Sequence, residues 1–193
     1  HICVWGPSGA GKSTLLHLLG LMTSPSSGGL TLFGRDAAGL PDGDRARLRN
    51  EKIGFLFQFH HLLPDLTLWE NVMMPLLIRR RSPDESRERA KELLSRLGLE
   101  ARLDHRPGEA SGGEQQRAAL ARALAGEPAL ILADEPTGNL DPINTWDIIK
   151  LLLRINELGT TVILATHDKE IINSLGKRVI SLDKGRIIRD EKE

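Results

Sequence analysis

The feature that most constrains this chain is a glycine-rich stretch near its start. Residues 6–14 read Gly-Pro-Ser-Gly-Ala-Gly-Lys-Ser-Thr and match G-x-x-x-x-G-K-[S/T] at every fixed position. The short apolar run from Ile2 to Trp5 predicts a buried strand before it, and the leucine-rich run from Leu15 predicts a helix after it. This strand–loop–helix order favours a phosphate-binding P-loop over an ordinary glycine turn.

The composition of the loop suits a nucleoside triphosphate. Glycines let the backbone wrap closely around an anion, and the N–H groups at the start of the next helix point toward it. Lys12 is placed to reach the β- and γ-phosphates, and the Ser13 hydroxyl to ligate Mg²⁺. The predicted phosphate-binding residues are Gly6, Pro7, Ser8, Gly9, Ala10, Gly11, Lys12, Ser13 and Thr14.

Predicted strands alternate with predicted helices along the rest of the chain. This alternation is typical of an α/β architecture with a largely parallel sheet, and 193 residues are enough for one domain with a substantial core. The expected strands after the first cover 30–33, 53–57, 129–133 and 160–165, the expected helices cover 83–97, 112–125 and 143–158, and a strand–turn–strand with its turn at 183–185 ends the chain.

Four polar residues directly follow predicted strands: Gln58, Asp134, Glu135 and His167. Because ligands bind at the carboxyl ends of parallel strands, we expect these residues to meet at one edge of the sheet. Asp134 could hold Mg²⁺ through water and Ser13, Glu135 could act as a general base, His167 could contact the γ-phosphate, and Gln58 could sense the metal and the attacking water. The alternative is that the four polar residues are unrelated. This alternative could account for any one of them, but it accounts poorly for all four in this order.

A second glycine-rich stretch opens a later helix. Its serine can cap the helix and its glycines leave the N-terminus open, so it could bind an anion that belongs to another subunit. The alternative is a capped helix with no further role. The residues concerned are Ser111, Gly112, Gly113, Glu114 and Gln115.

Charge and composition exclude several classes of function. The 26 basic residues balance the 26 acidic ones, so nothing indicates a general nucleic-acid binder, and a single cysteine, Cys3, excludes an intrachain disulfide framework. No apolar run is long enough to span a bilayer, so membrane association would need a partner. Arg45, Arg47 and Arg49 predict a solvated helix face rather than a binding patch, and adjacent His60 and His61 predict contact or surface residues rather than metal ligands.

Taken together, these motifs resemble the nucleotide-binding subunits of ABC transporters across essentially the whole chain. Residues 6–14 match the Walker A motif, Gln58 the Q-loop, 111–115 the signature, 130–135 the Walker B motif with its glutamate, and His167 the switch histidine; 138–141, ending in Asp141, match the D-loop. Ala110 departs from the leucine that usually precedes the signature serine, and we expect function to survive this loss of apolar packing.

The resemblance implies a P-loop NTPase of the ABC ATPase type. It implies one nucleotide-binding domain over 1–193, with a mostly parallel sheet core at about 1–58 and 129–193 and a helical signature subdomain at about 59–128. Family members begin with strands that carry an adenine-stacking aromatic residue, so we expect these N-terminal strands to be missing here. Restoring an upstream segment should then tighten nucleotide binding.

The resemblance also implies a mechanism. Two copies, most simply a homodimer, would sandwich two ATP molecules, with Mg²⁺ at each site. Each P-loop would face residues 111–115 of the other copy, and Asp141 would couple the two sites. ATP binding would close the pair, and hydrolysis to ADP and phosphate would reopen it.

Two segments, 48–78 and 135–141, resemble more narrowly the LolD, MacB and FtsE group of this family. That likeness implies a peripheral subunit on the cytoplasmic face of the bacterial inner membrane, docked on integral membrane permease subunits through about residues 59–78 and binding no nucleic acid. Residues 48–78 favour lipoprotein release. An FtsE-like cell-division regulator and a MacB-type exporter ATPase are the alternatives, whereas a translation or DNA-repair ATPase would normally join two such domains or carry long insertions.

Overall fold

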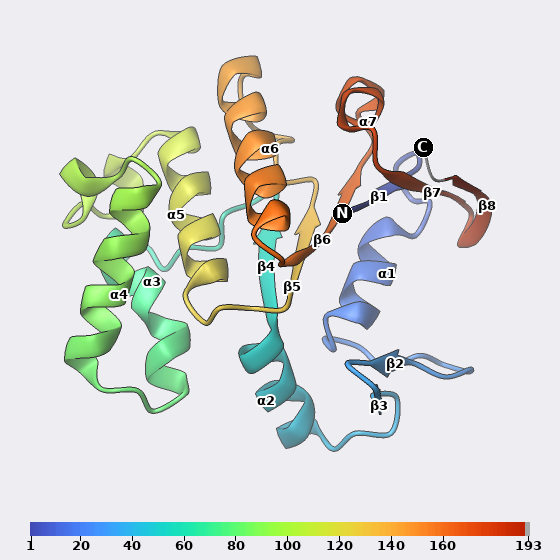
Figure 1. The fold of residues 1–193 in the computed structure, drawn as a ribbon, viewed down its shortest axis with the longest axis horizontal. Coiled ribbons are helices and arrows are strands. Elements are labelled where there is room, and N and C mark those ends of the chain that lie inside the picture. Colours follow the sequence, from blue (N-terminus) through green and yellow to red (C-terminus); the bar gives the residue numbers. More distant parts are fainter. Residues whose placement is uncertain (192–193) are drawn as a thin grey trace.

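The computed structural model describes residues 1–191 and centres on one six-stranded sheet (Figure 1). The strand order is β4-β5-β6-β1-β7-β8; the first five strands are parallel, and β8 runs antiparallel to β7. The expectation of a mostly parallel α/β sheet is confirmed. Residues 192–193, which end the predicted core segment, lie outside the described residues. The strands are β1 Ile2–Trp5, β4 Ile53–Phe57, β5 Leu130–Asp134, β6 Thr161–Thr166, β7 Arg178–Asp183 and β8 Arg186–Glu191.

Seven α-helices and two short 3₁₀ turns connect the strands within residues 1–191. None of these helices is both long and apolar enough to cross a bilayer. The helices are α1 Lys12–Leu19, α2 Asp42–Lys52, α3 Leu68–Ile78, α4 Pro83–Arg96, α5 Gly112–Leu124, α6 Pro142–Glu157 and α7 Lys169–Leu175; the 3₁₀ turns cover Glu100–Arg102 and Pro107–Glu109. The expected strand at 30–33 is shorter, because β2 Thr31–Leu32 pairs only with β3 Arg35–Asp36 in a separate hairpin.

Strand β5 shows how the sheet is buried on both faces. Ile131 and Ala133 pack with α5 and α6 on one face, whereas Leu130 and Leu132 pack with α1 on the other. Successive side chains of a strand point to opposite faces, so a strand covered on both sides is a continuous apolar run. Cys3, in β1, belongs to the first of these clusters, and burial raises the pKa of its thiol to about 11.

A third apolar cluster holds α3, α4 and α5 together beside the sheet, on the left of Figure 1. Helix α5 belongs to both regions. Ala119 and Leu120 pack into the sheet core, and Ala118 and Ala121 pack into the helical cluster. Helix α5 is therefore shared between the sheet and the helical layer.

Helix α5 approaches β4 closely because Gly54 lies between them. A Cβ at residue 54 would come within 2.6 Å of the carbonyl oxygen of Ala123, a distance that real Cβ atoms do not reach. This glycine is needed for close backbone approach, which is one of the uses of glycine in a strand.

Two of the three arginines on α2 do not simply face solvent, contrary to the expectation from the sequence. Arg45 and Arg49 both donate to the carbonyl oxygen of Leu21, at 3.1 and 3.0 Å. Arg47 pairs outward with Asp44, and Arg45 also reaches exposed Asp42 and Ser24. The two inner arginines bind the end of the P-loop helix segment to α2. The sequence could not show this because the carbonyl they share lies more than twenty residues away.

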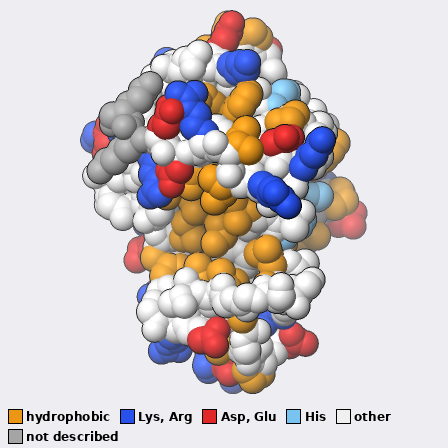
Figure 2. All heavy atoms as spheres, turned by 90° about the vertical axis from the view of Figure 1, so that its right-hand side faces the viewer, with side chains coloured by type: hydrophobic (Ala, Val, Ile, Leu, Met, Phe, Trp, Pro, Cys, Tyr) orange, Lys and Arg blue, Asp and Glu red, His pale blue; other side chains and the backbone are white. Residues whose placement is uncertain are grey.

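Figure 2 shows the side of the molecule opposite the helical layer, where α1, β2, β3, β7 and β8 lie. Apolar side chains gather in a hollow in the middle of this face. The same elements carry exposed Phe33, between β2 and β3, and exposed Ile187 and Ile188 on β8. This apolar hollow lies on the side away from the helical layer.

Candidate functional site

Register places the predicted site residues on one edge of the sheet. Phe57 pairs with Asp134, Asp134 with Ala165, and Ala165 with Val4, so four strands reach the same level together. Gln58, Glu135 and the segment around His167 follow directly on these strands, as does the P-loop. The expectation that parallel strand ends would bring these segments together is confirmed.

The P-loop wraps around the open start of α1. Gly11 caps that helix with φ of 101°, a left-handed conformation that glycine adopts without strain, and no side chain caps the helix. The amide of Gly185 donates to the Ala10 carbonyl at 3.0 Å and holds the loop to the β7–β8 turn. The helix start is left with free N–H groups and no acidic residue in its first turn, an arrangement suited to an anion.

A pocket of about 420 Å³ lies between this loop and the strand ends. It draws on four separate parts of the chain. Its lining residues are Ser8, Gly9, Gly11, Lys12, Ser13, Thr14, Gln58, Glu135 and His167.

Glu135 lies at the centre of the charged groups in this pocket. The nearly buried ammonium of Lys12 is 3.3 Å from Glu135 Oε1, and His167 Nδ1 is 3.0 Å from the same oxygen. Lys12 Nζ also donates to the carbonyl oxygens of Gly6 and Pro7, at 2.8 and 3.2 Å. The cation of the loop is therefore already balanced by a carboxylate and by the loop's own carbonyls.

The backbone of Glu135 is left-handed, with φ of 47°. A non-glycine residue in this region is uncommon and costs free energy. The amide of Glu135 donates to the Ala165 carbonyl at 2.9 Å, so the turn is fixed to the neighbouring strand β6. At this turn the backbone leaves the direction of β5, and the carboxylate of Glu135 reaches the pocket.

Asp134, one residue earlier, does not line the pocket but carries an unpaired atom. Its Oδ1 is buried and has no hydrogen-bond partner among the described residues. A buried carboxylate oxygen without a partner is costly, so the site suits a cation or an ordered water. Carboxylate and hydroxyl oxygens are suitable ligands for Mg²⁺, which commonly uses only one or two carboxylates and keeps water and phosphate oxygens. Residues 1–191 hold no group of three or more His, Cys, Asp or Glu that could bind a metal by itself.

Gln58 has a partner that the sequence did not reveal. Its Nε2 donates to Asn139 Oδ1 at 3.1 Å, and the Asn139 amide points back toward the Gln58 carbonyl at 3.5 Å. Asn139 lies inside the D-loop match, 81 residues away in sequence. Only the pairing of β4 with β5 brings the two amides together, so no local pattern could have shown the contact.

Residues 111–115 do not line this pocket. Ser111 caps α5 as expected: Ser111 Oγ accepts from the Glu114 amide at 3.3 Å, and Glu114 Oε2 accepts from the Ser111 amide at 2.7 Å. Glu114 also pairs with Arg102 at 3.0 Å. The Ser111 amide and then the Arg102 guanidinium lower the pKa of Glu114 to about 2.

Asp141 lies beside the start of α5. It caps α6 by accepting from the Asn144 amide at 3.0 Å, and this hydrogen bond lowers its pKa. Asn144 in turn contacts α5: a Cβ on Gly113 would come within 2.1 Å of Asn144 Oδ1, to which Arg117 donates at 3.5 Å. The structure thus brings Asp141 and the start of α5 of one chain together, and neither lines the pocket formed by its own P-loop.

Comparison with known proteins agrees with this geometry. Residues 1–138 match the family model described as ABC transporter. The lipoprotein-releasing system ATP-binding protein LolD of Bordetella pertussis is 48% identical over 190 residues, which are 98% of this chain and 82% of the relative. The LolD proteins of Bordetella parapertussis and Bordetella bronchiseptica match to the same extent.

Two solved structures have closely similar folds. They are a dimeric post-hydrolysis state of the ATP-binding cassette MJ0796 bound to ADP and Pi, and a dimeric structure of MJ0796 described as a bacterial ABC transporter cassette. Each is 42% identical with a TM-score of 0.90, covering 99% of this chain and 84% of the other. The family match covers well over half of the residues, and the chain therefore belongs to the ABC transporter family as one of its ATP-hydrolysing cassettes.

Proposed function

We propose that this chain is the ATPase subunit of a bacterial transporter that releases lipoproteins from the inner membrane. The observation that carries the chemistry is the pocket in which Glu135 lies between Lys12 and His167. The 48% identity to LolD proteins over nearly the whole chain supports lipoproteins as the cargo.

The P-loop would bind the triphosphate of ATP. The free amides at the start of α1 would donate to the phosphate oxygens, and Lys12 would turn from Glu135 toward the β- and γ-phosphates. Phosphate oxygens and Glu135 compete for the same ammonium, so nucleotide binding would release the carboxylate for catalysis.

Ser13, Gln58 and Asp134 would hold Mg²⁺, with the unpaired Asp134 oxygen acting through water. The bound ion would neutralise charge on the phosphate oxygens as the terminal phosphate departs.

Glu135 would accept a proton from the water that attacks the γ-phosphorus, while the bond to the β–γ bridging oxygen breaks and releases ADP and phosphate. His167, which contacts Glu135 Oε1, would hold the carboxylate and the water in line. Gln58, which lines the same pocket, would orient the same water.

A second copy would complete each site. Residues 111–115 and Asp141 lie outside the pocket of their own chain, and both MJ0796 structures are dimers. In a head-to-tail homodimer the start of α5 would face the partner's nucleotide, and Asp141 would link the two sites.

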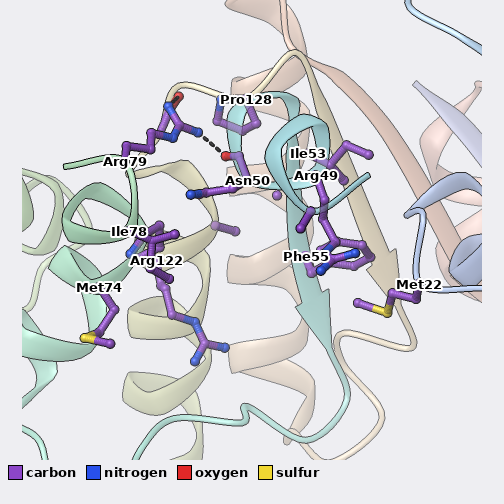
Figure 3. A pocket seen from close by; sticks show the side chains of 15 residues that line it. Met22, Arg49, Asn50, Ile53, Phe55, Met74, Ile78, Arg79, Arg122 and Pro128 are labelled. Atoms are coloured by element: carbon purple, nitrogen blue, oxygen red, sulfur yellow. Dashed lines mark hydrogen bonds between the residues drawn. The ribbon is translucent and has the colours of Figure 1, made fainter. Parts of the chain in front are cut away.

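The membrane partner would dock on the cytoplasmic side through residues 59–78 and the groove beside them. A pocket of about 430 Å³ lies between α3 and β4, with Met74 and Ile78 on one side and Ile53 and Phe55 on the other (Figure 3). Arg79, at the end of α3, closes its rim by donating to the Asn50 and Gly126 carbonyls. Exposed Ile78 and Phe59 provide the apolar contact that a helix of a permease subunit needs.

Substitution of Glu135 by Gln tests the chemistry. The amide cannot accept the proton of the attacking water, so turnover should fall by about a hundred-fold or more while ATP still binds. Size-exclusion chromatography with ATP and Mg²⁺ should then show a stable dimer of Glu135→Gln and a transient one of the unaltered chain. Turnover of Glu135→Gln at the unaltered rate would remove Glu135 from this role.

Purification of the tagged protein from detergent-solubilised membranes tests the cargo. Membrane subunits together with a bound lipoprotein are expected. A single division-associated membrane partner would instead assign the chain to the cell-division regulators.

A further inference from the structure

A fully buried glutamine links α5 to two of the strand ends that form the pocket. The Nε2 of Gln116 donates to the carbonyl oxygen of Phe57 at 3.0 Å and also to that of Pro136. Phe57 directly precedes Gln58, and Pro136 directly follows Glu135. One side chain thus holds the backbone beside both residues.

The chemistry of this environment requires an amide that donates twice. Both neighbours are carbonyl oxygens, so only the NH₂ group of the side chain can face them. Its other atom, Oε1, is buried and has no hydrogen-bond partner among the described residues. Such an oxygen carries a desolvation penalty that an apolar side chain of the same length would avoid. Packing alone therefore does not account for a glutamine at this position.

The surrounding contacts hold α5 to the end of β4 at several points. Gly54 lets α5 lie directly on β4, as described above. Beyond Gln58, Arg122 of the same helix donates to the His60 and His61 carbonyls at 2.8 and 2.5 Å. Gln116 and Arg122 thus hold α5 to both ends of the segment that contains Gln58.

We propose that Gln116 is a positioning residue, which sets the places of Gln58 and Glu135 and transmits displacements of the start of α5 to both. The inference rests on the proposed function, in which residues 111–115 face the partner's nucleotide. Gln116 is the next residue along the same helix, so engagement of one nucleotide would reach the other catalytic site through two hydrogen bonds.

These contacts predict that substitution of Gln116 lowers the turnover of ATP without an equal loss of affinity for ATP. The two hydrogen bonds of Gln116 go to the ends of β4 and β5, whereas the P-loop lies between β1 and α1. Gln116→Met keeps the length of the side chain and removes both donors. We expect kcat to fall by about ten-fold or more, since small misplacements of catalytic groups are costly, while the dissociation constant for ATP changes by less than about three-fold.

Two further variants separate positioning from stability. Asn156→Ala removes two side-chain hydrogen bonds at the opposite end of the sheet, one to the Thr160 carbonyl at 2.9 Å and one from the His1 amino group at 3.3 Å, and should leave kcat unchanged. Gln116→Glu keeps the shape of the side chain. Its protonated carboxyl can donate to one carbonyl and its carboxylate to none, so kcat should decline with rising pH relative to the unaltered chain. Thermal unfolding of every variant gives the stability change.

The outcomes decide between the claims. A kcat of Gln116→Met equal to that of the unaltered chain overturns the inference, as does a parallel loss of kcat, ATP affinity and melting temperature. If the unaltered chain fails to hydrolyse ATP, or if Glu135→Gln turns over normally, the proposed function fails instead.

Discussion

At the scale of single residues, Glu114 combines a helix cap with an ion pair. Its carboxylate accepts from the Ser111 amide and from Arg102, and these contacts lower its pKa from 4.5 to about 2. The folded state therefore favours the ionised form. The resulting stabilisation is fully present above pH 4.5 and is lost as the pH falls toward 2.

This predicts a specific pH dependence for Glu114→Gln. The amide can still cap the helix but cannot titrate, so the difference in melting temperature between the two proteins should shrink as the pH falls from 4.5 toward 2. Thermal denaturation followed by circular dichroism across this range measures it. A difference that stays constant with pH would show that the charge of Glu114 does not stabilise the fold.

Individual residues also show what the sequence could and could not predict. Gln58, Glu135 and His167 were expected at one edge because each follows an apolar run, and parallel strands align such ends. The pairing of Lys12 with Glu135 depends on a distance across three strands, which no local pattern carries. Gln116 could have been recognised from the sequence, because it is a polar residue in the otherwise apolar helix stripe that contains Gly113, Ala119 and Leu120.

At the scale of elements, the packing of α5 on β4 can be tested at Gly54. A Cβ there would meet the backbone of Ala123 at 2.6 Å, so Gly54→Ala must push the helix from the strand. We expect a loss of about 1–3 kcal/mol in the free energy of unfolding, as for other overpacked sites. Chemical denaturation with urea measures the change.

The matched control is Gly43→Ala in the exposed first turn of α2. Nothing lies within 4 Å of a Cβ at this position, so the substitution should be neutral or stabilise by about 0.5–1 kcal/mol. Equal effects of the two substitutions would contradict the close contact of α5 with β4.

Two helices could be located from their ends. Ser82 with Pro83, and the capping box of Ser111 with Glu114, mark starts that the structure reproduces. The hairpin β2–β3 was harder to predict, because its two-residue strands lack the length over which alternation can be recognised.

At the scale of the whole molecule, the exposed part of α3 predicts how the chain assembles with membrane subunits. Ile78 is 66% exposed on the rim of the proposed docking groove, so Ile78→Asp should sharply reduce the amount of membrane subunit that copurifies with the tagged protein. Leu158→Asp is the control, since Leu158 is 75% exposed at the far end of α6. Equal recovery of membrane subunits with both variants would place the contact elsewhere.

The division into a sheet core and a helical subdomain remains a proposal at this scale. Separate apolar clusters support it, but α5 contributes to both of them. The sequence placed a boundary near residue 128, before β5, whereas packing assigns α5 to neither region alone.

The pocket draws no lining residue from positions 59–134, although that stretch forms α3, α4 and α5. The lining residues of the chain's own pocket and α3, which would meet the membrane subunits, therefore occupy different parts of the chain, whereas the start of α5 would meet the partner's nucleotide. Substitutions on the exposed face of α3 would therefore alter the fit to a membrane subunit while leaving the lining of the nucleotide pocket unchanged. The membrane partner, and with it the cargo, would then change while the ATPase chemistry stays the same.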